Sequence, residues 1–325
     1  MRVAGPRSAV VVNPVKVPDM EFLRSVIGEG LAMAGWPAPV WHETTVADPG
    51  RGQAEQAVRD GAELIFVCGG DGTVMSVVTA VAGSDVALAV LPAGTGNLLA
   101  ANLGLGDDPA TGVVVALEGG RKRIDVGVTG DRCFAVMAGI GFDARMLEGT
   151  SERAKKHLGW LAYVGGGLKH LRDRPMRARI VLDGGAPKPR RARTVIVGNV
   201  GRLQGGLRLL SRADPADGKL DVAILSPNNL AHWVRLAWAV MSRRERIPLM
   251  ETFTAERVEI YTRRTQPRQL DGDLIEPGRA LRIHVKPQAL LLCVPRPDGD
   301  PDLAYDAGAA AEAAKGLRVR TDPAG

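Results

Sequence analysis

The sequence predicts two domains with a cleft between them: an α/β domain on a parallel sheet, followed by a mainly antiparallel β-sandwich domain. In the first third, apolar runs typical of buried strands alternate with segments whose apolar residues recur at helical spacing. From residue 124 onward, short alternating segments separated by turn residues predominate. The length of 325 residues also fits two domains. We place them at residues 1–122 and 123–295, with a tail at 296–325.

The pattern in the first domain predicts repeated strand–helix units, and such units favour a parallel sheet covered by helices on both faces. The predicted strands cover residues 9–12, 40–41, 64–68 and 87–91. The predicted helices cover residues 22–31, 53–59, 74–82 and 97–103.

The second domain reads as short strands with helical insertions expected at about 153–172 and 229–243. The predicted strands cover residues 124–128, 177–182, 193–197, 220–225, 257–261 and 281–285. The basic run 188–193 is expected to be a solvated loop. The tail is compositionally biased and expected to be poorly ordered. Whether the last strand returns to the first domain stays open.

Composition restricts the class of protein. Lys and Arg (42) exceed Asp and Glu (36) by six, a mild excess compatible with anionic partners. Only 4% of the residues are aromatic, which argues against base-stacking surfaces, so no nucleic-acid partner is predicted. The three cysteines are far apart and form no CxxC motif, which favours a reducing compartment. We expect no signal peptide and no membrane span, and hence a cytoplasmic protein.

Two glycine-rich loops each follow a predicted buried strand and precede a predicted helix: GGDGT at 69–73 and AGTGN at 93–97. Glycine lets a phosphate approach the backbone, and the following helix supplies amide N–H groups and a positive dipole end. Thr73, Thr95 and Asn97 can add hydrogen bonds, and Asp71 can hold a metal or a proton. Such loops also occur merely for tight packing. Neither is a Walker loop or a GxGxxG motif.

Together these motifs resemble the catalytic domain of the diacylglycerol kinases, a family shared by bacterial lipid kinases and the sphingosine and ceramide kinases. The resemblance runs from Val10 to about Val294, and its nucleotide-binding domain is similar to those of phosphofructokinases and NAD kinases. Further segments match in the family's order: Asn13-Pro14, Thr44-Thr45, Gly141-Phe142-Asp143, Gly205-Gly206, the DGKLDV run at 217–222, and Asp271-Gly272-Asp273.

The resemblance implies an ATP- and Mg²⁺-dependent lipid kinase and a set of site residues. It places the nucleotide at Asn13, Pro14, Thr45, Gly69, Gly70, Asp71, Gly72, Thr73, Gly94, Thr95, Gly96 and Asn97. It assigns Asp273 as the general base, with Asp71 as the competitor and Asp271 beside it. It also implies a structural Mg²⁺ at Asp214, Asp217 and the backbone carbonyl of Lys219. For both aspartate groups, an ordinary Asp-Gly turn is the alternative.

Several residues depart from the family pattern. Ser76 and Leu98 stand where the family has acids, the NPVKV loop (13–17) lacks its usual glycine, and Asp273 replaces a glutamate. These departures bear on metal stoichiometry and on the identity of the base.

Two segments could contact a membrane surface, because each combines aromatic with nearby basic residues: 159–171, with Trp160, and 230–241, with Trp233 and Trp238. For each, the alternative is a core helix packed on the second domain. We expect peripheral contact with the inner face of the membrane, where the lipid substrate lies, and a homodimer stays open.

The leading hypothesis is a kinase that phosphorylates diacylglycerol or a related lipid. One alternative is a kinase of a soluble substrate similar to NAD kinases, which share a GGDG loop. Another is a lipid- or nucleotide-binding protein with little catalysis.

Overall fold

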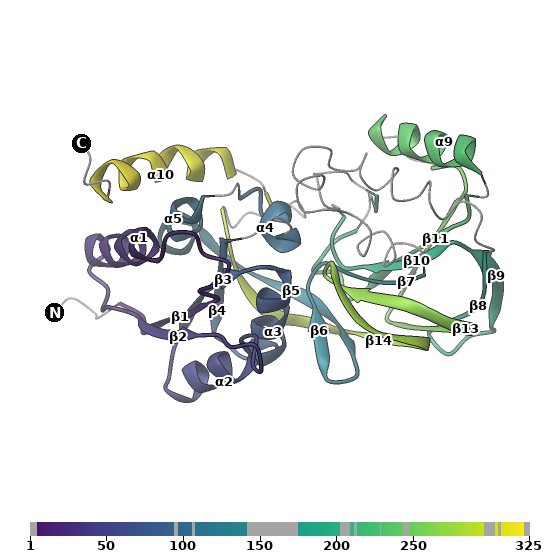
Figure 1. Cartoon of the computed structure of the whole chain (residues 1–325), viewed down its shortest axis with the longest axis horizontal. Coiled ribbons are helices and arrows are strands. Elements are labelled where there is room, and N and C mark those ends of the chain that lie inside the picture. Colours follow the sequence, from purple (N-terminus) through teal and green to yellow (C-terminus); the bar gives the residue numbers. More distant parts are fainter. Residues whose placement is uncertain are drawn as a thin grey trace. The chain divides into compact units, whose positions relative to one another are not determined.

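A computed structural model describes residues 5–93, 97–105, 108–141, 175–201, 209–210, 213–227, 229–242, 247–295, 303–304 and 307–321. The chain forms two compact units (Figure 1). Unit 1 comprises Met1–Ile124 and Gln288–Gly325, and unit 2 comprises Asp125–Pro287.

Unit 1 contains the parallel sheet that the sequence predicts. Its strands are β1 (Ser8–Val12), β2 (Val40–Glu43), β3 (Leu64–Gly69), β4 (Ala87–Pro92) and the end of β14 (Asp273–Val294). Their order is β14-β4-β3-β1-β2, and every neighbouring pair is parallel. The carboxyl ends of these strands therefore lie along one edge, which is where ligands bind in open α/β sheets.

Helices cover both faces of this sheet (Figure 1). On one face lie α1 (Met20–Met33), α5 (Pro109–Glu118) and α10 (Ala307–Thr321), which contact one another. On the other lie α2 (Arg51–Arg59) and α3 (Asp71–Val81), also in contact. The short α4 (Leu98–Asn102) follows β4. Asp19 begins α1, since its carboxylate accepts a hydrogen bond from the Phe22 amide at 2.8 Å.

Unit 2 is built mainly from antiparallel strands. They are β5 (Gly120–Thr129, which begins in unit 1), β6 (Arg132–Phe134), β7 (Met137–Gly141), β8 (Met176–Leu182), β9 (Lys188–Ala192), β10 (Thr194–Gly198), β11 (Leu220–Leu225), β12 (Met250–Ala255), β13 (Arg257–Leu270) and most of β14. Their main order is β12-β11-β10-β7-β13-β14, with β8 and then β9 attached to β13. Helix α9 (Leu230–Met241) packs through Leu236 on an apolar cluster that includes Ile196 and Leu225.

Some segments differ from the sequence-based expectation. The basic run at 188–193 is not simply a loop, because its first five residues form β9 and pair with β8. The tail, for which composition predicts poor order, contains α10, where Ala314 and Leu317 are buried. Residues from Gln288 onward cluster with unit 1. The helix expected at 153–172 lies outside the described residues. Within the described part of the chain, no helix is long and apolar enough to cross a membrane.

Candidate functional site

The first candidate residues lie at the carboxyl ends of β1 and β3, which are neighbours in the sheet of unit 1. The Asn13 amide N–H donates to the Cys68 carbonyl at 2.8 Å, so the chain after β1 stays beside the chain after β3. The Asn13 side-chain amide then donates to Thr73 Oγ1 at 3.4 Å. Its carbonyl oxygen accepts from the Val15 amide at 3.1 Å, which orders the turn that follows Pro14. The structure thus brings Asn13 and the GGDGT loop together.

The two leading glycines of the GGDGT loop serve different purposes. A Cβ at Gly69 would lie 2.7 Å from the Thr73 Cβ, so Gly69 is required for the turn to pack on the first turn of α3. At Gly70, an added Cβ would meet nothing within 4 Å, and its φ of −82° suits any residue. Close packing therefore requires a glycine at position 69, whereas at position 70, the N-cap of α3, glycine is favoured over alanine by helix capping and not by lack of space.

A carboxylate connects this loop with the second one. Asp71, the first residue of α3, accepts a hydrogen bond at 2.6 Å from the amide of Leu98, the first residue of α4. Asn97, immediately before Leu98, is buried and adopts a left-handed conformation with φ 39°. The starts of two helices that follow adjacent strands are therefore held together at one edge of the sheet. Residues 94–96 of the second loop lie outside the described residues.

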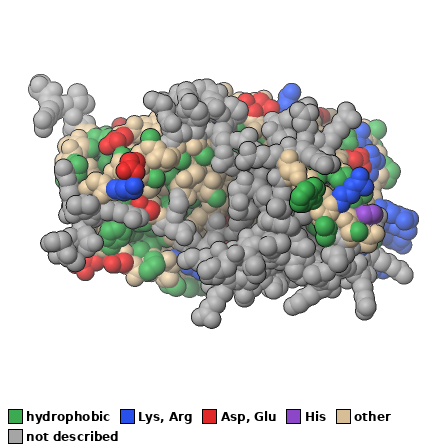
Figure 2. All heavy atoms as spheres, turned by 90° about the horizontal axis from the view of Figure 1, so that it is seen from above, with side chains coloured by type: hydrophobic (Ala, Val, Ile, Leu, Met, Phe, Trp, Pro, Cys, Tyr) green, Lys and Arg blue, Asp and Glu red, His purple; other side chains and the backbone are tan. Residues whose placement is uncertain are grey.

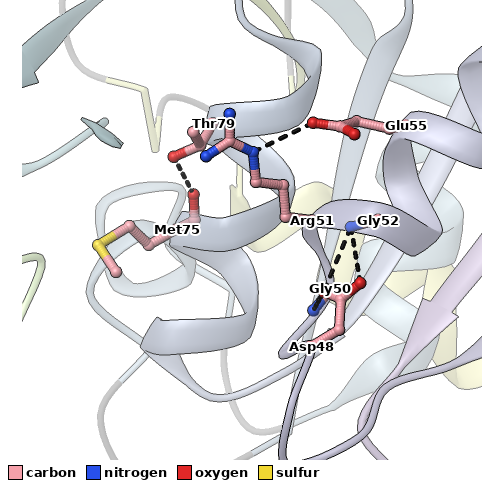
Figure 3. Close-up of polar contacts among 7 residues, drawn as sticks. All are labelled: Asp48, Gly50, Arg51, Gly52, Glu55, Met75 and Thr79. Atoms are coloured by element: carbon pink, nitrogen blue, oxygen red, sulfur yellow. Dashed lines mark hydrogen bonds and ion pairs between the residues drawn. The ribbon is translucent and has the colours of Figure 1, made fainter. Parts of the chain in front are cut away.

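The segment that follows β2 is ordered by Asp48 (Figure 3). The Asp48 carboxylate accepts hydrogen bonds from the Gly50 amide at 3.1 Å and from the Gly52 amide at 3.0 and 3.2 Å. Its backbone amide donates to Thr45 Oγ1 at 3.0 Å. A Cβ at Gly50 would lie 3.5 Å from the Thr73 carbonyl oxygen, so this segment lies against the GGDGT loop. Thr45 therefore belongs to the same edge of the sheet as Asn13 and Thr73.

Unit 2 places the Asp271-Gly272-Asp273 motif on the hairpin between β13 and β14. Leu270 pairs with Asp273, and the two residues between them have φ values of 44° and 90°. Positive φ at both positions identifies a type I′ turn, for which Asp-Gly is a preferred sequence. Asp273 is partly exposed where β14 begins. The ordinary Asp-Gly turn, which the sequence analysis gives as the alternative to a catalytic role, is therefore present. It places Asp273 at the start of β14.

The Asp271 carboxylate is buried and anchors this turn. It accepts hydrogen bonds from the amides of Ala135, Val136 and Met137 at 2.8–2.9 Å, and its own amide donates to the Met137 carbonyl at 2.8 Å. Burial raises the pKa of Asp271 to about 6. The hydrogen bonds from the three backbone amides oppose this rise, and the negative charge of Asp273 adds to it. Because three backbone donors surround this carboxylate, its geometry suits positioning more than proton transfer.

The third group of candidate residues lies on the turn before β11. The Asp214 carboxylate accepts from the Ala216 amide at 3.0 Å, and the Asp217 carboxylate accepts from the Lys219 amide at 2.9 Å. Desolvation, and then the charge of Asp217, raises the pKa of Asp221 to about 6. The donors here are carboxylate and carbonyl oxygens, the ligand types that Mg²⁺ prefers.

Sequence reasoning missed several residues that hold these loops. Asp48 is one of them, and Asp125 is another: it is buried and accepts from the Gly218 amide at 2.7 Å. Asn199 is also buried, and its side-chain amide donates to the carbonyls of Asp125 at 2.7 Å and Ala135 at 3.0 Å. For Asp125, the one available signal was an acid inside the apolar alternation of residues 124–128.

The sequence of each unit matches a known protein family. Residues 10–129 match the diacylglycerol kinase catalytic domain, and residues 136–294 match the YegS C-terminal NAD kinase beta sandwich-like domain. A probable lipid kinase, YegS-like, of Pseudomonas putida is 32% identical over 305 residues, which cover 92% of this chain and 98% of that protein. A diacylglycerol kinase of Mycobacterium tuberculosis is 32% identical over 187 residues, 55% of this chain and 60% of that protein.

Solved structures share the fold. A diacylglycerol kinase from Bacillus anthracis superposes with a TM-score of 0.66 at 20% identity and covers 89% of this chain and 97% of its own. An NAD kinase from Archaeoglobus fulgidus in complex with ATP gives a TM-score of 0.51 at 12% identity, covering 94% and 98%.

The fold and the relatives define a kinase of the diacylglycerol kinase catalytic-domain class. Within that class, the chain belongs to the family of YegS-like lipid kinases.

Proposed function

We propose that this lipid kinase transfers the γ-phosphate of ATP, with Mg²⁺, to a hydroxyl of diacylglycerol or a related lipid. The observation that carries the proposal is the 2.6 Å hydrogen bond from the Leu98 amide to Asp71. It holds the second glycine-rich segment beside the start of α3, and the start of that 11-residue helix supplies amide donors and a positive dipole end for phosphate groups.

Residues of unit 1 give the nucleotide its binding surface in this proposal. The GGDGT loop presents backbone N–H groups to the phosphates, and Gly70 leaves room for them because nothing lies within 4 Å of its missing Cβ. Asn13 and Thr45, which border this loop, orient the nucleotide through side-chain hydrogen bonds. Gly94, Thr95 and Gly96, which lie outside the described residues, are assigned to the nucleotide by their sequence motif alone.

The proton of the acceptor hydroxyl goes to Asp273 in our proposal. Asp273 is partly exposed beside a turn that is locked by the buried Asp271, so a carboxylate is held in a defined place. Asp71 is the less suitable base, because one of its oxygens already accepts the Leu98 amide. We therefore give Asp271 a positioning role and Asp273 the catalytic one.

The Mg²⁺ assignment is tested by the donors present. Asp214, Asp217 and the Lys219 carbonyl provide oxygen ligands on one turn, and a cation there would offset the repulsion between Asp217 and Asp221. These oxygens are what supports the proposed structural Mg²⁺; among the described residues, no group of three or more His, Cys, Asp or Glu side chains is placed to hold a metal ion. In phosphoryl transfer, bound Mg²⁺ neutralises charge on the phosphates.

Contact with the bilayer is proposed through α9. Val234 and Trp238, one helical turn apart, are 55% and 62% exposed, and Arg235 beside them is exposed too. Leu236 faces the apolar cluster of unit 2, so the helix is anchored on one side while its other side presents an aromatic and a basic residue. Such a surface suits the headgroup region of the inner leaflet.

Labelled ATP and a panel of lipids and soluble alcohols in detergent micelles test the proposal. We expect lipid-dependent ATP consumption with label on diacylglycerol or a related lipid, and loss of turnover in Asp273→Asn with unchanged thermal unfolding. Label on NAD instead would show a soluble-substrate kinase, and an absence of lipid-dependent turnover would leave a binding protein.

A further inference from the structure

Unit 2 presents an arginine-rich face on the strands β8, β9, β13 and β14. Exposed side chains there alternate with buried ones: Arg177 and Arg179 are exposed, while Ala178 and Ile180 between and beside them are buried. On β13, Arg257 is exposed and Val258 buried, and on β14 Arg282 is exposed between buried neighbours. The exposed side chains therefore lie on one face of this part of the sheet.

The register of the strands places these cations beside one another. Arg177 pairs with Arg191 on β9, which is also exposed. Arg179 pairs with Tyr261 on β13. Thr262 on β13 is buried and pairs with Ala178 on β8. Arg263, the next residue along β13, is exposed and therefore lies on the same face as Arg177. We call the set Arg177, Arg179, Arg191, Arg257, Arg263 and Arg282 the basic face.

An aromatic ring sits among these arginines. The guanidinium of Arg179 lies 5.0 Å from the centroid of the Tyr261 ring, and that of Arg282 lies 5.5 Å from it. The Tyr261 hydroxyl donates to Glu259 at 2.5 Å and accepts from Arg282 Nε at 3.2 Å. These contacts hold two guanidinium groups in place against the sheet.

Little negative charge balances this face. On β13, Glu259 is the acid at the outward positions; it accepts from the Tyr261 hydroxyl and lies opposite Arg282 on β14. In the part of the chain that the structure describes, no ion pair joins Arg177, Arg191 or Arg263 to a carboxylate. Figure 2 shows several Lys and Arg side chains, with an acidic side chain beside them, at the end of unit 2 that carries α9, β8 and β9 in Figure 1.

We infer that the basic face binds the anionic phospholipid headgroups of a bilayer and so makes the activity of this kinase sensitive to membrane charge. The inference rests on the proposed function, since a lipid acceptor brings the chain to a bilayer. Headgroup phosphates at a bilayer surface form a flat anionic layer, which matches cations spread over adjacent strands of one sheet face. A single-stranded nucleic acid would favour stacking on aromatic rings, whereas Tyr261 is already engaged by two arginines.

Sedimentation of the full chain with vesicles tests the inference, using phosphatidylcholine alone or with about one third phosphatidylglycerol. The test variant is the triple substitution Arg177→Gln, Arg191→Gln and Arg263→Gln. Each arginine near an anionic bilayer contributes about fivefold in affinity, so the triple variant should bind the anionic vesicles about a hundredfold more weakly. Binding of the wild type should also fall as salt rises from about 0.05 M to about 0.5 M.

The matched control removes the same charge from unit 1 by Arg24→Gln, Arg59→Gln and Lys315→Gln, all exposed residues. We expect near-wild-type vesicle binding for this control. Equal losses in both triple variants, or wild-type binding that ignores phosphatidylglycerol, would overturn the inference. Preference of the basic face for an oligonucleotide over anionic vesicles would overturn it as well, in favour of a nucleic-acid partner.

Turnover in uncharged detergent micelles separates this inference from the proposed function. The arginine variant should phosphorylate micellar lipid as the wild type does, and should differ from it only on anionic vesicles. Failure of micellar turnover in the wild type would count against the proposed function, whereas vesicle binding of the arginine variant equal to that of the wild type would count against the basic face alone.

Discussion

Replacing Asp271 by asparagine should change how the stability of the chain depends on pH. Asp271 titrates near pH 6 in the folded chain against an ordinary value of 3.8, a rise of about 2 units. The folded state therefore holds this proton more tightly than the unfolded state does. The stabilisation is complete below pH 3.8 and is lost as the pH rises through 6. At 1.36 kcal/mol per unit, the loss is about 3 kcal/mol.

Asparagine at position 271 removes this titration. It also turns a side-chain amide toward one of the three backbone N–H donors, which adds a roughly constant cost of about 1–3 kcal/mol. The difference in unfolding free energy, wild type minus Asp271→Asn, should therefore fall by about 2 kcal/mol between about pH 4 and about pH 6.5, which is most of the full loss, and stay nearly flat above about pH 7.

Urea unfolding at a series of pH values measures this difference. The matched control is Asp131→Asn, a change at an exposed aspartate of unit 2. A difference that stays constant across the pH range, or one that rises with pH, would refute the assignment of Asp271 as a buried carboxyl with a raised pKa.

Three further substitutions test particular contacts. Gly69→Ala should destabilise the chain by about 1–3 kcal/mol, because its Cβ would lie 2.7 Å from that of Thr73; thermal unfolding equal to the wild type's would contradict this. Asp48→Ala should cost about 1 kcal/mol and raise the KM for ATP, since it frees the Gly50 and Gly52 amides; an unchanged KM would remove this segment from the nucleotide site. Leu317→Ala should cost about 2–3 kcal/mol in urea unfolding with kcat unchanged, and a zero cost would mean that α10 does not pack on α1 and α5.

The sheet of unit 1 was predictable because its strands carry strong local signals. The LIFVC run at 64–68 and the ALAVL run at 87–91 are continuous apolar segments, and the structure confirms them as β3 and β4. The sequence predicts a loop at 188–193, and this prediction is wrong for the first five residues, which form β9 and pair with the preceding strand β8; a run of charged residues carries no apolar alternation that would indicate a strand. In the same way, α10 is held by Leu317 and Ala314 against other helices, which alanine-rich composition does not reveal.

The candidate site was predictable where glycines and acids stand together in sequence. The contact of Asn13 with Thr73 spans 60 residues, and the contact of Asp71 with Leu98 spans 27. The sequence motifs therefore identify these residues as candidates but do not indicate which residues they contact. The anchoring of Asp271 by the amides of residues 135–137 was not predictable, because backbone donors leave no signature in side-chain identity. Residue type alone therefore could not separate Asp271 from Asp273.

The most direct measurement of the central claim is nucleotide binding by Gly70→Ala. Gly70 is the N-cap of α3, where glycine is preferred over alanine, but its φ of −82° is ordinary and an added Cβ would meet nothing within 4 Å, so alanine there should cost less than about 1 kcal/mol of stability. If ATP phosphates bind at this loop, the added methyl group should weaken ATP binding in calorimetry by about tenfold or more, a loss of about 1.4 kcal/mol, while the chain stays folded and its unfolding temperature falls only by the small capping cost. ATP affinity equal to the wild type's in a fully folded Gly70→Ala chain would contradict the placement of the nucleotide.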